Sequence, residues 1–228
     1  DLMPAHYILY SFQTNPQLYF WQFFITKLLY KTCEICSFII LYRSDFIKHM
    51  NYQDILDFWF DAAHRPQWFA KSDDFDRLIA ERFQATHTAA CQAELWSWRN
   101  TAEGRLAEII VLDQFSRNLY RDSPRAFAQD ALALALAQEA ISLKLDQQLS
   151  PEQRSFLYMP FMHSESQIIH EFALKLFQRL GNPENLDFEK KHKVIIERFG
   201  RYPHRNQILG RQSSAEELEF LTQPNSSF

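Results

Sequence analysis

Charged and hydrogen-bonding side chains gather in one stretch near the carboxyl end of the chain, FGRYPHRNQILGR, residues 199–211. The stretch contains three arginines, a histidine and an asparagine beside two of the four glycines. Guanidinium groups bind carboxylates and phosphates through paired N–H donors, and histidine can exchange a proton near neutral pH. We therefore expect an anion-binding loop, part of a catalytic site, or a polar brace between helices. The candidate residues are Arg201, His204, Arg205 and Asn206.

A second candidate group lies in the middle of the chain. Asp113, Arg117 and Arg121 follow one another at intervals of four residues, which places them in a stripe along one side of a helix. Such a stripe can be a row of ion pairs on a solvated face, or it can contact a ligand. Because the helix is strongly apolar, its arginines should be partly buried and need carboxylate or carbonyl partners. Both interpretations stay open.

Three histidines and a glutamate complete the candidate set. His163 and Glu165 belong to the segment MHSES, which predicts a helix capped by Ser164 with Glu165 in its first turn, near the positive end of the helix dipole. Either His163 or His204 could be a general acid or base, or a buried hydrogen-bonding residue. His192 shares the apolar face of its helix, the usual place of a core histidine, and is retained among the ligand-binding candidates.

Metal and cofactor chemistry lack their sequence signatures. His163, Glu165, His192 and His204 carry suitable ligand atoms, but no two of them have the H-E-x-x-H or E-x-x-H spacing. The sequence contains no P-loop, no dinucleotide fingerprint and no G-x-S-x-G elbow. We therefore expect no metal and no cofactor.

From residue 51 onward the sequence shows a series of helical patterns with recognisable ends. These predicted helices position the candidate residues. The predicted N-terminal capping residues are Ser72, Thr101, Ser123, Ser150 and Ser214. The glycines predicted to end helices are Gly181 and Gly200. The segment ALALALAQEAISLKL alternates as a strand would, but its length and its Ala and Leu content favour a helix. We expect Pro160 to interrupt the helix that begins at Pro151. Roughly seven or eight helices joined by short links predict an all-α domain of antiparallel helical hairpins.

The whole chain of 228 residues carries a formal net charge of −4. This length suffices for one domain with a sizeable core and an appendage. Non-specific nucleic-acid binding usually needs a broad basic surface, so we expect no nucleic-acid partner. Three cysteines give no disulfide framework, and a cytoplasmic location is the default expectation.

Residues 1–49 differ from the rest in being rich in aromatic side chains and free of glycine. Charged residues interrupt the apolar run, so it is a poor membrane span, and it lacks the pattern of a secretory signal. Because Met50 directly precedes the amphipathic NYQDILDFWF, we expect Met50 to be the natural start and residues 1–49 to be an extension outside the domain of residues 50–228. One alternative is that residues 1–49 are a membrane anchor, and only in that case do we expect membrane contact. The other alternative is an additional helical hairpin.

Five blocks occur in order between residues 51 and 228, namely ILDFWF, WFAKSDDFD, LDQFSRNLYRDSPRAFAQDALALALA, FLYMPFMHSES and FGRYPHRNQILGR. Together they resemble the DUF924 family, bacterial proteins of unknown function with a tetratricopeptide-like helical fold. The resemblance implies a tetratricopeptide-like array for about residues 51–228. It implies no activity, substrate or cofactor.

The candidate residues favour a binding module as the leading function, because helical arrays offer concave grooves. We expect a pocket for an anionic small molecule or an acidic peptide terminus, built from Asp113, Arg117, Arg121, Glu165, His192, Arg201, Arg205 and Asn206. The alternative is an enzyme with His163 or His204 as general acid or base and arginines that hold an anionic substrate. The third interpretation is a purely structural polar cluster in a scaffold that binds a protein partner.

Overall fold

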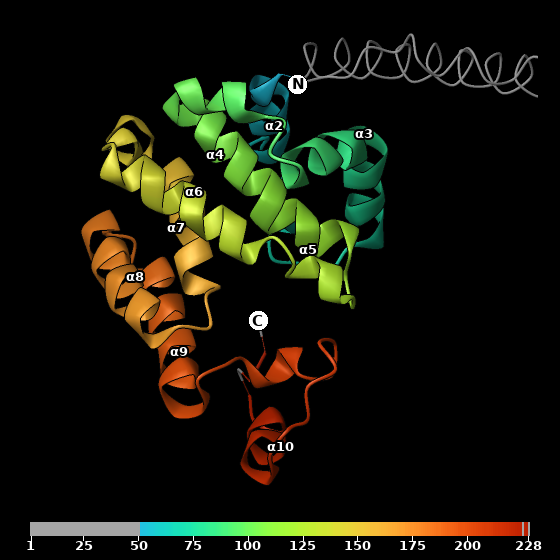
Figure 1. The fold of residues 1–228 in the computed structure, drawn as a ribbon, viewed down its shortest axis with the longest axis vertical. Helices are drawn as coiled ribbons and strands as arrows, with labels where there is room; N and C mark the ends of the chain where they lie inside the picture. Colours follow the sequence, from blue (N-terminus) through green and yellow to red (C-terminus); the bar gives the residue numbers. More distant parts are fainter. Residues whose placement is uncertain (1–50, 225, 228) are drawn as a thin grey trace, which may run out of the picture. The chain divides into compact units, whose positions relative to one another are not determined.

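The computed structural model describes residues 51–224, 226 and 227, which belong to one compact unit, residues 50–228. Every regular element in this part of the chain is a helix (Figure 1), which confirms the all-α class. None of the helices searched there combines the length and the apolar character that crossing a bilayer requires. The expectations for residues 1–49 lie outside the described residues, and the tetratricopeptide-like order of the helices stays a prediction.

The helices are α2 (Tyr52–Trp59), α3 (Asp73–Cys91), α4 (Ala102–Ile110), α5 (Ser116–Leu119), α6 (Asp130–Ser142), α7 (Pro151–Met162), α8 (Gln167–Leu180), α9 (Pro183–Phe199) and α10 (Ala215–Leu221). A π-helical turn, Val111–Phe115, joins α4 to α5, so that the three segments continue one another (Figure 1). This combined helix packs against α2, α3, α6 and α7 and is buried along most of its length. It therefore forms the centre of the main hydrophobic core.

Local capping rules predict most helix ends correctly. The hydroxyls of Ser72 and Thr101 accept backbone N–H groups at the starts of α3 and α4. Ser150 and Ser214 each form the predicted capping box, with Gln153 for α7 and Glu217 for α10. Gly181 and Gly200 end α8 and α9 in the left-handed conformation, where a side chain would be strained. The alanine-rich segment is helical, as predicted.

Two predicted helix boundaries, at Ser123 and at Pro160, are wrong. Ser123 opens only a short 3₁₀ turn, Pro124–Ala126, and the alanine-rich helix begins later, at Asp130. Pro160 does not interrupt α7, which continues to Met162. Because Pro160 lies within the last turn, its missing N–H removes one backbone hydrogen bond close to the natural end of the helix.

The start of α8 also differs from the prediction. Ser166, not Ser164, precedes the first helical residue, and His163 is the residue that ends α7. Glu165 therefore lies in the linker between the two helices rather than in a first turn. Its position is explained by the partners of its side chain, which are described below.

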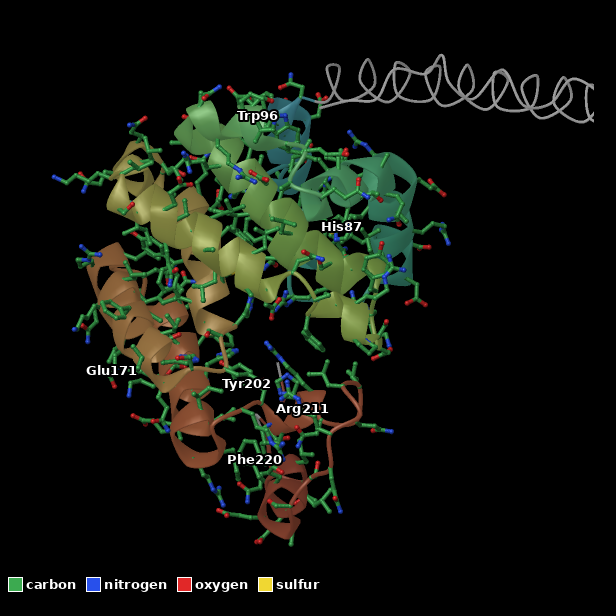
Figure 2. All side chains as sticks on the ribbon, viewed as in Figure 1. His87, Trp96, Glu171, Tyr202, Arg211 and Phe220 are labelled. Atoms are coloured by element: carbon green, nitrogen blue, oxygen red, sulfur yellow. The ribbon has the colours of Figure 1, made fainter. Side chains whose placement is uncertain are left out.

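The segment after α9 folds back onto the ends of α7 and α8. Tyr202 is completely buried and forms a small separate core with Ile195 and Ile196. Its hydroxyl donates to the Met162 carbonyl at 2.5 Å and lies 3.1 Å from His170 Nε2. This anchoring brings the arginine-rich loop, including the 3₁₀ turn Pro203–Arg205, against the helical array (Figures 1 and 2).

Candidate functional site

A pocket of about 360 Å³ opens where the region at the start of α6, the α7–α8 linker and the segment after α9 meet. Its wall consists of Pro124, Phe127, Ala128, Asp130, Ala131, Leu134, His163, Ser164, Glu165, Arg205, Leu209 and Arg211. Small-molecule sites usually measure about 300 to 1,000 Å³, so this pocket lies at the lower end of that range. Its walls come from three separate segments, and only folding brings them together.

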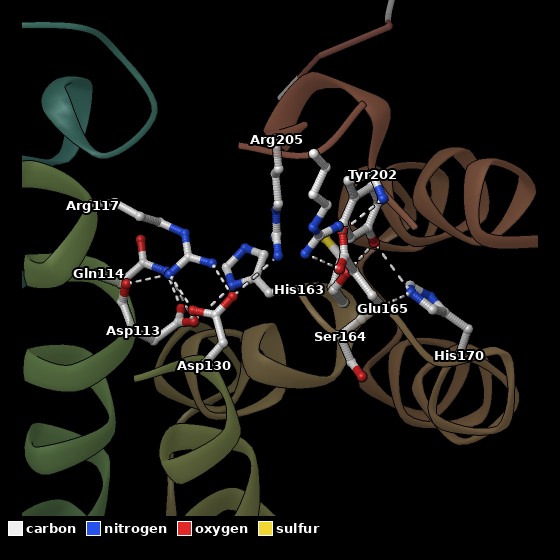
Figure 3. Close-up of polar contacts among 12 residues, drawn as sticks. Asp113, Gln114, Arg117, Asp130, His163, Ser164, Glu165, His170, Tyr202 and Arg205 are labelled. Carbon is white, nitrogen blue, oxygen red and sulfur yellow. Dashed lines mark hydrogen bonds and ion pairs between the residues drawn. The ribbon is translucent and has the colours of Figure 1, made fainter. Parts of the chain in front are cut away.

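An aspartate and a histidine from different helices form the first polar pair of the site (Figure 3). Asp113 lies in the π-helical turn, and its Oδ1 is 2.7 Å from His163 Nδ1. Burial alone would raise the pKa of Asp113, but His163, Arg117 and a hydrogen bond from Gln114 together hold it below its ordinary value. Asp113 is therefore anionic at neutral pH, so His163 Nδ1 carries the proton that it donates.

The surroundings of His163 favour its neutral form. Burial, followed by the charge of Arg117, lowers its pKa, although the Asp113 carboxylate acts in the opposite direction. With its proton on Nδ1, the imidazole presents Nε2 as a hydrogen-bond acceptor, and the side chain belongs to the pocket wall. An imidazole oriented by a buried carboxylate is a suitable general base, and π-helical turns such as the one that carries Asp113 often occur at functional sites.

Asp130, the first residue of α6, accepts hydrogen bonds from two arginines. Arg117 donates to its two oxygens at 3.0 and 3.1 Å and also to the Asp113 carbonyl at 2.6 Å. Arg205 donates to Asp130 Oδ2 at 3.2 Å. Figure 3 shows both guanidinium groups converging on this carboxylate. Asp130 thus links the central helix, α6 and the loop after α9.

Arg205 is a buried cation whose donors are largely unused. Its side chain is 8% exposed, and its guanidinium lies 4.5 Å from the Phe127 ring centre and 4.6 Å from that of Tyr202. Asp130 is its one hydrogen-bond partner among the described side chains, and its Nε has none. Burial lowers the pKa of Arg205, but arginine keeps its charge in proteins. A buried guanidinium with spare N–H donors in a pocket wall is suited to an anionic group.

Glu165 and Arg211 form the other charged pair of the wall. Arg211 donates to the two oxygens of Glu165 at 2.9 and 2.7 Å, and the Tyr202 backbone N–H donates to the same carboxylate at 2.8 Å. Burial would raise the pKa of Glu165, but these hydrogen bonds and the charge of Arg205 hold it below its ordinary value. Glu165 is thus a fixed anion that ties the linker to the carboxyl-terminal segment.

Formal charges in the wall balance. Arg205 and Arg211 contribute two positive charges, and Asp130 and Glu165 contribute two negative charges. Behind them, Asp113 and Arg117 add one charge of each sign. The wall therefore offers strong local donors and acceptors without a net positive potential.

The structure brings five of the predicted residues together, namely Asp113, Arg117, His163, Glu165 and Arg205. The other five lie elsewhere, and their partners explain why. Arg121 pairs with Asp76 of α3, and Arg201 pairs with Glu217 of α10. The chain leaves the helix after Leu119, so Arg121 no longer continues the stripe.

His192, His204 and Asn206 also lie outside the pocket wall. His192 is buried, its Nδ1 contacts the Phe188 carbonyl at 2.8 Å, and burial lowers its pKa to about 3. His204 lies beside Tyr202, and burial lowers its pKa to about 4. Asn206 is completely buried and donates to Ser213. All three support the loop rather than line the pocket.

Sequence reasoning missed several residues of the site. Nothing in the local sequence sets Asp130 apart from other acidic residues, and Arg211 lies in the arginine-rich stretch but is not among the predicted candidates. Neither Phe127, which faces Arg205, nor the buried pair of His170 and Glu189 behind Tyr202 carries a local signal. The density of arginines in residues 199–211 was the one clue that could have included Arg211.

A larger groove of about 800 Å³ lies along α6, α7 and α8, with walls that are mainly apolar and include Ile141, Phe161 and Phe172. It contains neither the histidines nor the carboxylates discussed above, so we place the candidate site in the smaller pocket. No cluster of three or more potential metal ligands occurs within residues 51–224 or at 226 and 227.

Comparison with known proteins finds a family and a solved structure. The family model described as bacterial protein of unknown function (DUF924) matches residues 55–225. The structure of a protein of unknown function, ATU0120 from Agrobacterium tumefaciens, is similar with a TM-score of 0.71 and 41% sequence identity, covering 75% of this chain and 96% of that chain. No curated protein matches.

Proposed function

The chain belongs to the DUF924 family of bacterial proteins, and on that premise we propose that its pocket binds a small molecule through a carboxylate or a comparable anionic group. The observation that carries this proposal is the buried Arg205 guanidinium in the pocket wall, with Asp130 as its one hydrogen-bond partner in the described part of the chain. An incoming carboxylate would use donors that the protein leaves free. The volume of about 360 Å³ lies within the usual range of small-molecule pockets.

A thermal-shift screen of the full chain tests this proposal directly. The chain is heated with monocarboxylates, dicarboxylates, amino acids, inorganic phosphate and nucleotides, each in excess. A ligand at 100 times its dissociation constant stabilises the folded state by about 2.7 kcal/mol, which raises the midpoint by several degrees. We expect carboxylates to stabilise the chain. Stabilisation by none of these compounds would refute the proposal.

A proton-transfer enzyme is the second candidate, favoured by the 2.7 Å contact between Asp113 and His163 at the pocket. In this scheme Arg205 holds the substrate anion, while His163 Nε2 accepts a proton from the substrate or from a water molecule. The imidazolium that forms is stabilised by the adjacent Asp113 carboxylate. Both functions use the same pocket and differ in whether the bound molecule changes.

NMR of the imidazole nitrogens tests the arrangement that the enzyme needs. With ¹⁵N-labelled protein at neutral pH, His163 should show a protonated Nδ1 and an unprotonated Nε2. A proton on Nε2 instead would exclude His163 as the base. Incubation of the stabilising carboxylate with the full chain, followed by mass spectrometry, then distinguishes binding from turnover.

A structural brace is the third candidate, since every arginine of the cluster has a carboxylate partner. Under that interpretation, loss of Arg205 lowers stability and affects no ligand. The brace and the binding pocket are therefore separated by ligand affinity, measured on variants that remain folded.

A further inference from the structure

The balance of charge in the wall restricts the ligand further than a simple anion. We infer that the pocket is built for a zwitterion with an apolar tail, of the class of α-amino acids with apolar side chains. This inference rests on the proposed function, because it assumes that Arg205 receives the ligand carboxylate. It adds to the proposed function that the ligand also carries a positively charged group.

Acceptors for that cation lie beside the arginine. A carboxylate can accept about four hydrogen bonds. Asp130 accepts three from described residues, one on Oδ1 and two on Oδ2, which leaves a site on Oδ1. Glu165 likewise accepts two on Oε1 and one on Oε2. An ammonium group has three N–H donors, and the neutral His163 offers a further acceptor at Nε2.

Spacing of opposite charges in the wall resembles the spacing in the ligand. Arg205 Nη1 and Asp130 Oδ2 lie 3.2 Å apart, so the Asp130 carboxylate, whose Oδ1 keeps an acceptor site, lies beside the unused donors of Arg205. In an α-amino acid the two charged groups are attached to one carbon atom. A ligand with a net negative charge would unbalance a wall whose formal charges already cancel, and a polyphosphate would be opposed by both Asp130 and Glu165.

Apart from Ser164, the side chains in the rest of the wall are apolar. Phe127, Leu134 and Leu209 surround the remaining volume, and Ala128 and Ala131 are exposed alanines that keep it open. Burial of a side chain of the size of Leu or Phe against such a surface adds affinity in proportion to the apolar area removed from water. The pocket wall thus combines charged groups with an apolar surface.

Matched ligands test the inference by calorimetric titration of the full chain. Leucine and phenylalanine are compared with 4-methylpentanoate and 3-phenylpropanoate, which lack only the ammonium group, and with leucinamide, which lacks the carboxylate. We expect leucine or phenylalanine to bind at least tenfold more tightly than its partner without the ammonium group and more tightly than leucinamide. If the carboxylic acids bind as tightly as the amino acids, the zwitterion inference fails while the proposed function stands. If neither class binds, both fail.

A pair of substitutions on one helix locates the binding. Ala131→Phe fills the pocket from an exposed position without touching an ion pair, and Ala135→Phe places the same side chain one turn further along α6, outside the wall. We expect the first substitution to weaken amino-acid binding at least tenfold and the second to leave it unchanged. Equal affinity in both variants would show that the amino acid binds elsewhere and would overturn the assignment.

Discussion

Arg205 and Asp130 lie 75 positions apart in the sequence, and their side chains meet at 3.2 Å in a pocket wall. Asp130 also binds Arg117 through both of its oxygens, so it does not depend on Arg205 for a partner. Arg205, in contrast, has no second hydrogen-bond partner among the described residues, although its guanidinium packs against Phe127 and Tyr202. This asymmetry indicates that Arg205 does more than neutralise Asp130, and it leads to the predictions below.

Replacement of Arg205 by Ala should cost only moderate stability. The change removes one charged hydrogen bond and the packing of the Arg205 guanidinium against the rings of Phe127 and Tyr202. Because Asp130 keeps its ion pair with Arg117, we expect the free energy of unfolding to fall by about 1–3 kcal/mol. Chemical denaturation of the full chain measures this loss. Arg77→Ala, at an arginine 65% exposed and paired only within its own helix, is the control and should change stability by less than about 0.5 kcal/mol. A variant of Arg205 that cannot fold would favour the structural brace.

Asp113→Asn should destabilise the chain in a pH-dependent way. The amide keeps the shape but removes the negative charge that pairs with Arg117 and the carboxylate that accepts from His163 Nδ1, which we expect to cost about 2–4 kcal/mol at pH 7. The pKa of Asp113 lies below its unfolded value, so its stabilising effect is present above about pH 4 and is lost as the pH falls through the folded pKa. Free energies of unfolding for both proteins should therefore converge below pH 4. A difference between the two curves that stays constant from pH 4 to about pH 2 would contradict the assigned charge.

His87 should make the chain sensitive to mild acid. It is buried beside Ser116, and burial together with Arg125 lowers its pKa to about 4, below the unfolded value of about 6.5. The unfolded state then binds the proton more readily, so stability falls as the pH drops from about 6.5 to 4, by up to about 1.4 kcal/mol per pH unit. His87→Gln should reduce this slope and leave the interval from pH 7 to 8 unaffected. An unchanged slope between pH 6.5 and 4 would show that His87 is not responsible.

Tyr202→Phe should loosen the loop that carries Arg205. The hydroxyl donates to the Met162 carbonyl at 2.5 Å, and its loss leaves that buried carbonyl without this partner, at a cost of about 1–2 kcal/mol. Hydrogen exchange of the amides in residues 203–211 should accelerate, because the segment opens more often. Tyr120→Phe is the control, because among the described residues the Tyr120 hydroxyl accepts a hydrogen bond only from the exposed Gln84. Equal exchange in both variants would mean that Tyr202 does not anchor the loop.

Features of the fold that depend on residues close together in the sequence could be predicted correctly. Ser150 with Gln153 and Ser214 with Glu217 are recognisable because a capping box spans four positions, and Gly200 because it follows directly on an amphipathic helix. Such signals defined the all-α class and most helix ends. They also identified the arginine-rich loop as unusual.

Partners at a distance could not be predicted in the same way. Arg117 and Arg121 belong to the same stripe on an ideal helix, yet one binds Asp130 and the other binds Asp76. The π-helical turn Val111–Phe115 and the end of α5 at Leu119 shift the register, and no residue type in the segment signals either feature. The contact of Asp130 with Arg205 depends on how α6 and the carboxyl-terminal segment pack, which a single sequence does not specify.

Affinity of the carboxylate for a conservative variant of Arg205 tests the central claim most directly. The carboxylate that gives the largest thermal shift is titrated into the parent chain, Arg205→Lys and Arg77→Lys. Lysine keeps the charge and loses the planar donor fork, so we expect Arg205→Lys to bind at least tenfold more weakly while the control binds as the parent does. Equal affinity in all three proteins would contradict the claim that Arg205 holds the ligand.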